Sequence, residues 1–310
     1  MIVTVTPNAS MDRTYLVEEF GIDRINRPLE TWVCAGGKGI NVARVLKELG
    51  RDALATGFVG GQTGDLIVRW LSTDGIKQDF LRVEQESRLC VKVMDPKNGT
   101  QTEINEKGPE IAEADLEAMK AKVDSLLPQC DFLMLCGNCP PGVPAGFYAD
   151  LVRLAKLRGV RSIVDTSGDA LREAVKASPM MVKPNVAELS QLAGAELCTL
   201  EEILRAAKSL KQFGIGITAV TMGRTGAIVT DGVQVWQATP PEISFASAVG
   251  SGDAFLAAFA DSLQAAESLQ DALAWATAAG AANATTYRAG FCSKESIMET
   301  RQGVTLSKVD

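Results

Sequence analysis

The sequence predicts an α/β protein with a mostly parallel central β-sheet. Short β-branched or apolar runs, typical of buried strands, alternate with amphipathic helical patterns along most of the 310 residues. Strands separated by helices form βαβ units, which place helices on both faces of a parallel sheet. No linker, low-complexity tract or fixed-period repeat interrupts the pattern, so we expect a single domain over residues 1–310.

The spacing of apolar residues sets the predicted elements. Leu116, Met119, Val123 and Leu126 fall three or four residues apart, which puts them on one face of a helix. Similar spacing recurs within residues 151–157 and 203–210. The predicted buried strands are residues 2–6, 54–59, 132–136, 162–165, 180–183, 218–222 and 227–230.

Two segments break this alternation. Residues 14–33 and 90–104 contain short, roughly alternating strand patterns with no helix between them. Asp95, Asn98 and Gly99 are typical of a hairpin turn in the second segment. We expect a small antiparallel sheet that projects from the main body. The pattern leaves two interpretations open: an extension of a sheet edge, or a lid over a site.

The composition excludes several kinds of catalysis. The chain has no histidine, which removes Ser-His-Asp and Cys-His catalysis, histidine-ligated zinc and any imidazole acid or base. Chemistry must therefore depend on carboxylates, lysine, arginine, backbone amides, cysteine or a bound metal. The formal net charge is −7, whereas nucleic-acid binding needs a basic surface, so we expect no nucleic-acid partner.

Cysteine and hydropathy patterns indicate a cytoplasmic protein that binds no membrane. The nearest set of cysteines, Cys130, Cys136 and Cys139, lacks the histidine or second cysteine pair of a zinc site. We interpret the seven cysteines as buried thiols in a reducing cytosol. Apolar stretches such as residues 254–260 are far shorter than a membrane span, and residues 1–7 lack the charged segment of a secretory signal.

The strongest motif is AVGSGD at residues 248–253, directly before an apolar helical run. Glycines at a helix start let a ligand approach the backbone, and the unpaired N–H groups of the first turn stabilise an anion. Asp253 belongs to this helix start. Its carboxylate either caps the helix by accepting hydrogen bonds from these same N–H groups or serves a bound ligand. The motif alone leaves both open.

A second glycine-rich segment, AGGKGIN at residues 35–41, begins another predicted helix. It permits close approach to the backbone, and Lys38 and Asn41 add a cation and an amide. It is not a Walker A loop, because the GxxxxGK[ST] spacing is absent. The alternative interpretation is a tight turn without a ligand.

Two further segments follow predicted strands. In residues 183–188, Asn185 and Glu188 lie one helical turn apart and carry oxygen atoms suited to Mg²⁺, directly or through water. The same spacing fits a capping box. In residues 221–226, a glycine-rich turn either binds a nucleotide phosphate or joins two strands.

Taken in order, these segments resemble the PfkB branch of the ribokinase-like carbohydrate kinases, and the resemblance spans essentially the whole chain. It implies a ribokinase-like αβα sandwich with a β-sheet lid formed by about residues 12–34 and 88–106. The motifs that carry it are TPNASMD (6–12), AGGKGINVARVL (35–46), GFVGGQTG (57–64), TEINEKGPEI (102–111), IVDTSGDAL (163–171), VKPNVAEL (182–189), TMGRTGA (221–227) and VGSGDAF (249–255).

The resemblance also implies roles for particular residues. Asp253 would accept the proton of the attacking sugar hydroxyl, and the amides of Gly250, Ser251, Gly252 and Asp253 would surround the transferred phosphoryl group. Asn185 and Glu188 would hold Mg²⁺ through its water shell. The sugar site would contain Asp12, Arg27, Gly36, Gly37, Lys38, Asn41, Arg88 and Asn138. The ATP site would contain Lys183, Asn185, Thr221, Gly223, Gly226 and Asn283.

Within the family, the likeness is to kinases of sugar phosphates: 1-phosphofructokinase, tagatose-6-phosphate kinase and the minor 6-phosphofructokinase. Four positions depart from family patterns. Asn138 replaces a serine that can touch the substrate, Ser251 replaces an alanine, and Leu89-Cys90 replaces the Ile-Asn common in fructose-1-phosphate kinases. We expect ATP-dependent conversion of fructose 1-phosphate to fructose 1,6-bisphosphate, with tagatose 6-phosphate and then fructose 6-phosphate as alternative substrates.

Two other classes of function are considered. An NAD-binding dehydrogenase needs GxGxxG directly after the first strand, but residues 7–12 read PNASMD. A non-catalytic sensor of sugar phosphates would keep the fold, but Asp253, Lys183 and Glu188 are intact. We therefore expect a sugar phosphate, ATP and Mg²⁺ as partners and leave K⁺ open. The exposed edges of a lid sheet would favour a homodimer through the lid.

Overall fold

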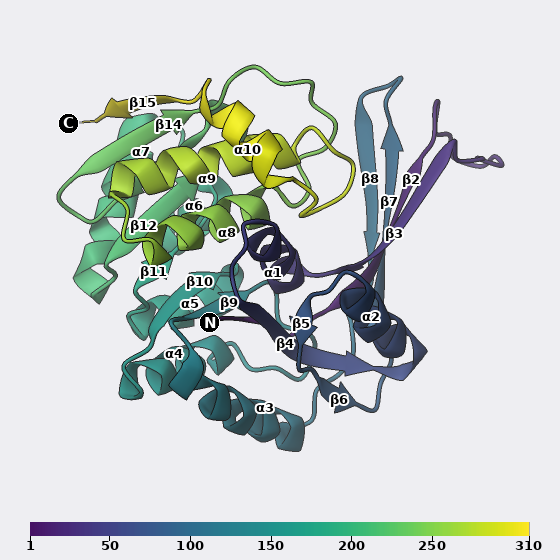
Figure 1. Ribbon diagram of the computed structural model, residues 1–310, viewed down its shortest axis with the longest axis horizontal. Helices are drawn as coiled ribbons and strands as arrows, with labels where there is room; N and C mark the ends of the chain where they lie inside the picture. The colour runs from purple at the N-terminus through teal and green to yellow at the C-terminus, as the bar shows by residue number, and fades with distance from the viewer. Residues whose placement is uncertain (310) are drawn as a thin grey trace.

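The structure is a computed structural model that describes residues 1–309. Within these residues, one large sheet runs in the order β15-β14-β13-β12-β11-β10-β9-β1-β4-β5, with β6 paired to β4 (Figure 1). Pairings from β5 to β12 are parallel, and β13, β14 and β15 are added antiparallel. The strands are β1 (Ile2–Thr6), β4 (Ala53–Gly60), β5 (Lys77–Gln78), β6 (Leu81–Val83), β9 (Phe132–Cys136), β10 (Arg161–Asp165), β11 (Met181–Val182), β12 (Ile217–Thr221), β13 (Ala227–Thr230), β14 (Val235–Thr239) and β15 (Thr305–Lys308).

The mostly parallel sheet is confirmed, and every predicted buried strand occurs. Three predicted strands have the observed bounds, and the others differ at their ends by one residue. The sequence pattern missed β14 and β15 at the antiparallel edge. All four residues of β15 are exposed, so this strand lacks the apolar run by which a buried strand is recognised.

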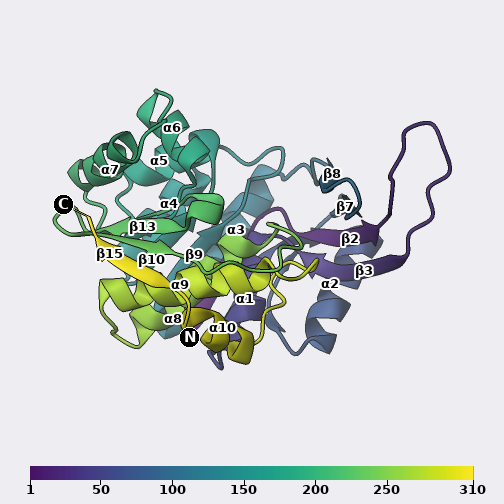
Figure 2. The same cartoon turned by 90° about the horizontal axis from the view of Figure 1, so that it is seen from above.

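Helices cover both faces of the sheet, which confirms the αβα sandwich (Figure 2). Neighbouring residues of β9 supply opposite cores: Met134 packs on one face, and Leu133 and Leu135 on the other. One layer contains α1 (Lys38–Glu48), α2 (Gly61–Thr73), α8 (Ser251–Gln264), α9 (Leu269–Asn283) and α10 (Lys294–Arg301). The other contains α3 (Glu113–Leu126), α4 (Phe147–Leu157), α5 (Gly168–Lys176), α6 (Val186–Ala193) and α7 (Leu200–Ser209).

The predicted helical faces are buried except at the end of the face in residues 151–157, where Leu157, the last residue of α4, is exposed. Leu116, Met119 and Val123 of α3 point into the core, as do Ile203 and Ala207 of α7. Within residues 1–309, none of the helices combines the length and the apolar character that crossing a bilayer requires.

A second, four-stranded sheet projects from the body (Figure 1). Its order is β3 (Glu30–Gly36), β2 (Ser10–Leu16), β7 (Arg88–Asp95) and β8 (Thr100–Asn105). The outer pairings, β2–β3 and β7–β8, are the predicted antiparallel hairpins, whereas the central β2–β7 pairing is parallel. Both hairpins leave the body on their first strand, so these two strands run in the same direction. The sheet is separate from the central one, which excludes the edge extension.

Two of the contacts between this projecting sheet and the body lie beside the α8–α9 pair. Trp32 of β3 stacks on Tyr287, which follows α9, with ring centroids 5.5 Å apart. Oγ of Ser247, in the segment before α8, donates a 3.2 Å hydrogen bond to Oε1 of Gln101 on β8. The sheet therefore touches the segments on both sides of the α8–α9 pair.

The topology brings the predicted motifs to one edge of the central sheet. The carboxyl ends of β1, β9, β10, β11 and β12 lie at this edge because these strands are parallel and neighbouring. From β1 the chain goes first to β4 on one side and later returns to β9 on the other. Such a reversal of strand order opens a crevice at the carboxyl ends, where ligands bind in α/β proteins.

Candidate active site

Asp253 lies in the first turn of α8 but does not cap that helix. Its Oδ2 accepts a 2.8 Å hydrogen bond from Nδ2 of Asn41 on α1. The N-cap residue of α8 is Gly250, and no side chain of the described residues caps the helix. The capping alternative for Asp253 is therefore wrong. Its carboxylate faces α1 across the crevice, and the N–H groups of Ser251 and Asp253 donate instead to the backbone carbonyls of Ala248 and Gly250, at 3.2 and 3.1 Å.

The surroundings of Asp253 adjust its basicity. Burial raises the pKa of Asp253 above its ordinary value, and the negative charge of Asp165 acts in the same direction. Lys38, the hydrogen bond from Asn41 and Lys183 act in the opposite direction and only partly offset the rise. A carboxylate whose pKa is raised towards neutrality accepts a proton more readily than an ordinary aspartate.

Asp165, the last residue of β10, bridges two lysines. It is fully buried, and its carboxylate lies 3.0 Å from Nζ of Lys38 and 3.2 Å from Nζ of Lys183. Burial acts to raise the pKa of Asp165, but the two lysines outweigh this effect and lower it. Lost hydration acts against the charge of Lys38, yet Asp165, Asp253 and Glu188 outweigh it and raise the pKa of Lys38. The ammonium group of Lys38 is therefore held charged.

These charges lie at the start of α8. A Cβ added to Gly252 would be 3.4 Å from Nζ of Lys183, which places the ammonium group beside the first helical turn. Gly250 has φ +81°, and a Cβ there would be 2.7 Å from Cα of Ala289, so only glycine fits. The exposed end of the helix dipole and a lysine together create a positive site for a phosphoryl group.

The segments predicted to bind ATP meet at the ends of β11 and β12. The backbone of Asn185 pairs with that of Thr221, and the N–H of Thr221 donates a 3.1 Å hydrogen bond to the carbonyl of Pro184. Gly223 begins the next short turn, where an added Cβ would meet no atom within 4 Å. The structure thus brings Lys183, Asn185 and Thr221 together, and it leaves space beside Gly223.

Asn185 and Glu188 form the capping box of α6. Oδ1 of Asn185 accepts from the N–H of Glu188, and Oε2 of Glu188 accepts from the N–H of Asn185, both at 2.8 Å. Within residues 1–309, there is no group of three or more cysteine, aspartate and glutamate side chains arranged to hold a metal. These two oxygen donors fit Mg²⁺, which keeps several waters and binds one or two carboxylates together with substrate phosphates.

Asp12 lies on the inner face of the lid, at the sugar side of the predicted site. Its Oδ1 accepts a 2.6 Å hydrogen bond from Oγ of Ser10, and its Oδ2 accepts a 2.8 Å bond from Nζ of Lys92. A Cβ at Gly36 would be 2.3 Å from the carboxyl carbon of Asp12, so the carboxylate packs directly on this glycine. Gly37, with φ +111°, is the N-cap of α1 and follows directly.

Arg88 and Asn138 approach the crevice from opposite sides. Arg88 begins β7, and its Nε donates a 3.2 Å hydrogen bond to the carbonyl of Asn8 in the β1–β2 connection. Asn138 follows β9, and its Oδ1 accepts a 2.8 Å bond from Oγ of Ser167. The exposed Asn138 therefore keeps its NH₂ group available as a donor.

A family model described as pfkB family carbohydrate kinase matches residues 3–296 of the chain. The chain belongs to the PfkB family of carbohydrate kinases. It is 36% identical over 302 residues to the tagatose-6-phosphate kinase of Staphylococcus epidermidis, covering 96% of this chain and 97% of that protein. It is 40% identical over 257 residues to the 1-phosphofructokinase of Rhodobacter capsulatus, covering 83% and 81%.

Solved structures of PfkB-type kinases have the same fold. A possible 1-phosphofructokinase from Thermotoga maritima matches with a TM-score of 0.93 and 28% identity over the full length of both chains. Phosphofructokinase-2 of Escherichia coli, solved with substrates and products, matches with a TM-score of 0.90 and 28% identity, covering 97% of this chain and 98% of that one. The predicted fold class and sugar-kinase activity of this PfkB protein are confirmed.

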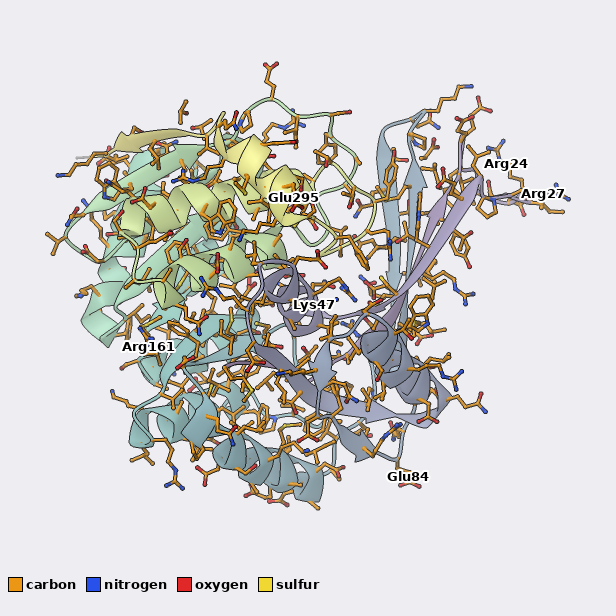
Figure 3. All side chains as sticks on the ribbon, in the orientation of Figure 1. Arg24, Arg27, Lys47, Glu84, Arg161 and Glu295 are labelled. Atoms are coloured by element: carbon orange, nitrogen blue, oxygen red, sulfur yellow. The ribbon has the colours of Figure 1, made fainter. Side chains whose placement is uncertain are left out.

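Three predicted site residues of this PfkB kinase lie in other surroundings than expected. Arg27 is exposed in the loop at the far tip of the lid and points away from the crevice (Figure 3). Asn283 is fully buried, and its amide bonds to the carbonyl of Val249 at 2.8 Å and the N–H of Gly290 at 2.8 Å. It supports the start of α8 and presents no group to ATP. Asn41 is buried too, and its amide is engaged by Asp253.

Sequence reasoning missed three charged residues of the PfkB site. The motifs at residues 163–171 and 35–46 contain Asp165 and Arg44 but predict no role for them, and none of the motifs contains Lys92. Lys92 did carry a signal, because it alternates with Cys90 and Met94 on the buried face of β7. A lysine on such a face needs a buried partner, but the partner's identity depends on strand pairing.

Proposed function

We propose that this PfkB kinase transfers the terminal phosphoryl group of ATP to a hydroxyl of a phosphorylated ketohexose. Fructose 1-phosphate, converted to fructose 1,6-bisphosphate, is the first choice. The observation that carries the proposal is the Asp253 carboxylate, which is held by Asn41 beside the uncapped start of α8. Phosphorylation of an alcohol requires a carboxylate that can accept the hydroxyl proton, placed next to a site that stabilises the phosphoryl anion. Asp253 is such a carboxylate, because it does not cap the helix.

Asp253 is the general base in this proposal. The sugar hydroxyl oxygen forms a bond to the γ-phosphorus, and its proton passes to the carboxylate of Asp253. The bond from this phosphorus to the β–γ bridging oxygen breaks, and its electron pair leaves with ADP. The raised pKa of Asp253 supports this role, because it matches the base more closely to neutral pH.

The transferred phosphoryl group lies at the first turn of α8. In this proposal the N–H groups of Gly250, Ser251, Gly252 and Asp253 surround it, those of Ser251 and Asp253 being shared with the backbone carbonyls of Ala248 and Gly250. Lys183 adds a positive charge beside Gly252. Lys38 stands between the phosphoryl group and the sugar. Its ion pair with Asp165 supports the proposal, because a fixed ammonium group stabilises developing charge without having to reorganise.

The nucleotide extends from there along the ends of β11 and β12. Thr221, Gly223 and Gly226 line its phosphate and ribose side. Asn185 and Glu188 would hold Mg²⁺ through its water shell, and the ion would neutralise charge on the ATP phosphates. Phosphofructokinase-2 of Escherichia coli has been solved in complex with potassium, so K⁺ belongs among the ions to be tested.

The sugar phosphate lies between the lid and the carboxyl ends of β1 and β9. Asp12 and Asn138 bind its hydroxyls, and Arg88 binds its phosphate as a charged hydrogen-bond donor. Gly36 supports this site by leaving room for the Asp12 carboxylate, which packs where a side chain would otherwise lie. Closure of the lid would exclude water from the reacting groups, since exposed phosphoryl donors are otherwise open to hydrolysis.

We also propose a cytoplasmic homodimer that pairs through the lid. Ile22 and Ile25 in the loop at the lid tip are 92% and 80% exposed, and Ile104 on β8 is 64% exposed. Apolar side chains gathered on one projecting element favour a protein partner. The cysteines of residues 1–309 are free thiols, which supports a reducing compartment, but Cys198 is exposed and not buried as expected.

Steady-state kinetics on three sugars tests the activity. We expect ADP release with Mg-ATP and a higher kcat/KM for fructose 1-phosphate than for tagatose 6-phosphate or fructose 6-phosphate. A preference for tagatose 6-phosphate, the activity named for the Staphylococcus epidermidis relative, would replace the first choice. Binding of all three sugars without ADP release would favour a non-catalytic sensor.

The Asp253→Asn variant tests the base. We expect kcat to fall by about 10²–10⁴-fold. Asp169→Asn is the matched control, because Asp169 occupies the first turn of α5 and is exposed. Near wild-type turnover of Asp253→Asn would refute the assignment.

A further inference from the structure

The buried side chains of Arg44, Asn41 and Asp253 are connected by hydrogen bonds in that order. Nη1 of Arg44 donates a 3.0 Å hydrogen bond to Oδ1 of Asn41, and Nδ2 of Asn41 donates the 2.8 Å bond to Oδ2 of Asp253. Arg44 and Asn41 lie one turn apart on α1 and are both buried. The arginine does not touch Asp253 directly and reaches it only through the asparagine amide.

We propose that Arg44 is a positioning residue of the phosphoryl transfer, which fixes the amide of Asn41 so that its NH₂ group faces Asp253. The inference rests on the proposed role of Asp253 as the base. A guanidinium group only donates hydrogen bonds, so it binds the oxygen end of the amide. A reversed amide would place its oxygen against the carboxylate and its NH₂ against the guanidinium, and both contacts would be repulsive.

Arg44 is itself held on several sides. Its Nη2 donates a 2.7 Å hydrogen bond to the carbonyl of Ala35 at the end of β3, and its Nη1 also lies 3.4 Å from the carbonyl of Ala289. The guanidinium carbon is 4.5 Å from the ring centre of Phe291, and Nε is 3.7 Å from a carboxylate oxygen of Asp74. The guanidinium group of Arg44 thus joins lid strand β3 to the loop around Ala289, which packs on Gly250.

The Asn41 donor affects the charge state of Asp253. The charged groups that face Asp253 are Lys38, Lys183 and Asp165, and they come from three other elements. The hydrogen bond from Asn41 acts with the two lysines to keep the pKa of Asp253 from rising further. When the amide is no longer oriented, the pKa of Asp253 rises. The protonated, inactive form then persists to higher pH.

A cavity beside Arg44 makes this arrangement accessible to a small probe. The cavity has a volume of about 450 Å³ and is lined by Arg44, Asp74, Phe291 and the exposed Lys47 and Glu48 of α1. Lys47, labelled in Figure 3, is one of the residues that line it. Truncation of Arg44 to alanine would extend this cavity to Asn41, and a guanidinium ion could enter it from solvent.

The first experiment measures pH profiles of kcat/KM for the wild type and Arg44→Ala. We expect kcat to fall by about 10–100-fold, because small misplacements of reacting groups have effects of this size. The acidic limb should move to higher pH, the KM for ATP should stay unchanged, and millimolar guanidinium chloride should restore part of the activity. Lys47→Ala, which lines the same cavity without contacting Asn41, should keep the wild-type profile.

A double-mutant cycle tests whether Arg44 acts through Asn41. In an Asn41→Ala background, Arg44→Ala should cause little further loss, because the intermediary is already absent. Additive effects of the two substitutions would overturn the proposal. So would a wild-type pH profile and turnover in a folded Arg44→Ala protein.

If the Arg44→Ala variant does not fold, Arg44→Lys tests whether Arg44 orients the amide of Asn41. It keeps the buried charge, but it replaces the planar fork, which reaches Asn41 and Ala35 from two separate nitrogens, with a single nitrogen. We expect a smaller shift of the acidic limb in the same direction, and an unchanged profile would overturn the proposal. Asp253→Asn is measured in parallel. If it stays fully active, the base assignment and this inference both fail; if it is inactive while the Arg44 variants match the wild type, only this inference fails.

Discussion

Lys92 and Asp12 form a buried ion pair inside the lid sheet. Nζ of Lys92 lies 2.8 Å from Oδ2 of Asp12, and each side chain is 8% exposed. Asp12 lies on β2 and Lys92 on the neighbouring β7, so the pair also joins the two lid hairpins. Burial acts to lower the pKa of Lys92, but Asp12 outweighs it and raises the pKa. The ion pair therefore fixes the orientation of the Asp12 carboxylate, which in the proposed site binds sugar hydroxyls.

Lys92→Met should weaken both the lid and sugar binding. It leaves a buried carboxylate without its partner, which typically destabilises a protein by about 3–5 kcal/mol. We expect a lower Tm and a higher KM for the sugar phosphate, with the KM for ATP unchanged. Combining it with Asp12→Asn removes the unpaired charge and should restore Tm, but not the KM for the sugar. Thermal unfolding and steady-state kinetics measure these effects, and an unaltered KM for the sugar in Lys92→Met contradicts the prediction.

Asp253→Asn should stabilise the protein while it removes activity. Because the pKa of Asp253 is raised in the folded state, its protonated form favours folding below the ordinary aspartate pKa. That contribution is lost as the pH rises through the raised value. At neutral pH the charged carboxylate thus opposes folding, and neutral asparagine relieves this. We expect an increase in Tm of about 1–4 °C at pH 7, and a smaller difference in acid. A lower Tm at pH 7 would show that the charge is fully compensated.

Arg88→Ala should affect the sugar phosphate far more than ATP. Arg88 lies at the base of the lid, where it bonds to the carbonyl of Asn8. Loss of a charged hydrogen bond to a phosphate should raise the KM for the sugar by about 10–100-fold. Arg82→Ala is the control, because Arg82 on β6 is exposed and pairs with Asp65. Equal effects on the two KM values would remove Arg88 from the acceptor site.

Asn138→Ser should change the choice among sugars. Ser167 occupies the amide oxygen of Asn138, so the side chain offers the crevice an NH₂ donor where family members often carry a hydroxyl. A serine donates and accepts, and it is shorter. We expect the ratio of kcat/KM between fructose 1-phosphate and tagatose 6-phosphate to change by about tenfold or more, with little effect on the KM for ATP. A constant ratio would mean that selectivity resides elsewhere.

Local sequence patterns alone predict the order of the strands and helices and the position at which α8 begins. The β-branched run of residues 2–6 and the apolar spacing of α3 are short-range patterns, and each forms the element it predicts. The AVGSGD segment indicated an anion site because glycine and a helix start are adjacent in sequence. The segment alone does not decide whether Asp253 caps the helix or serves a ligand, because Asn41, which donates a hydrogen bond to its carboxylate, is 212 positions away.

Ion pairs between residues far apart in the sequence are decided only by the tertiary structure. Lys92 and Asp12 are 80 positions apart, and Lys38 and Asp165 are 127 apart. Each pair meets because strands or helix starts are placed side by side, and no periodicity within either segment encodes that placement. The parallel pairing of β2 with β7 has the same origin, since it depends on where two hairpins leave the body. Motifs thus identify the reacting groups, whereas the packing of separate segments determines what holds each group in its charge state and orientation.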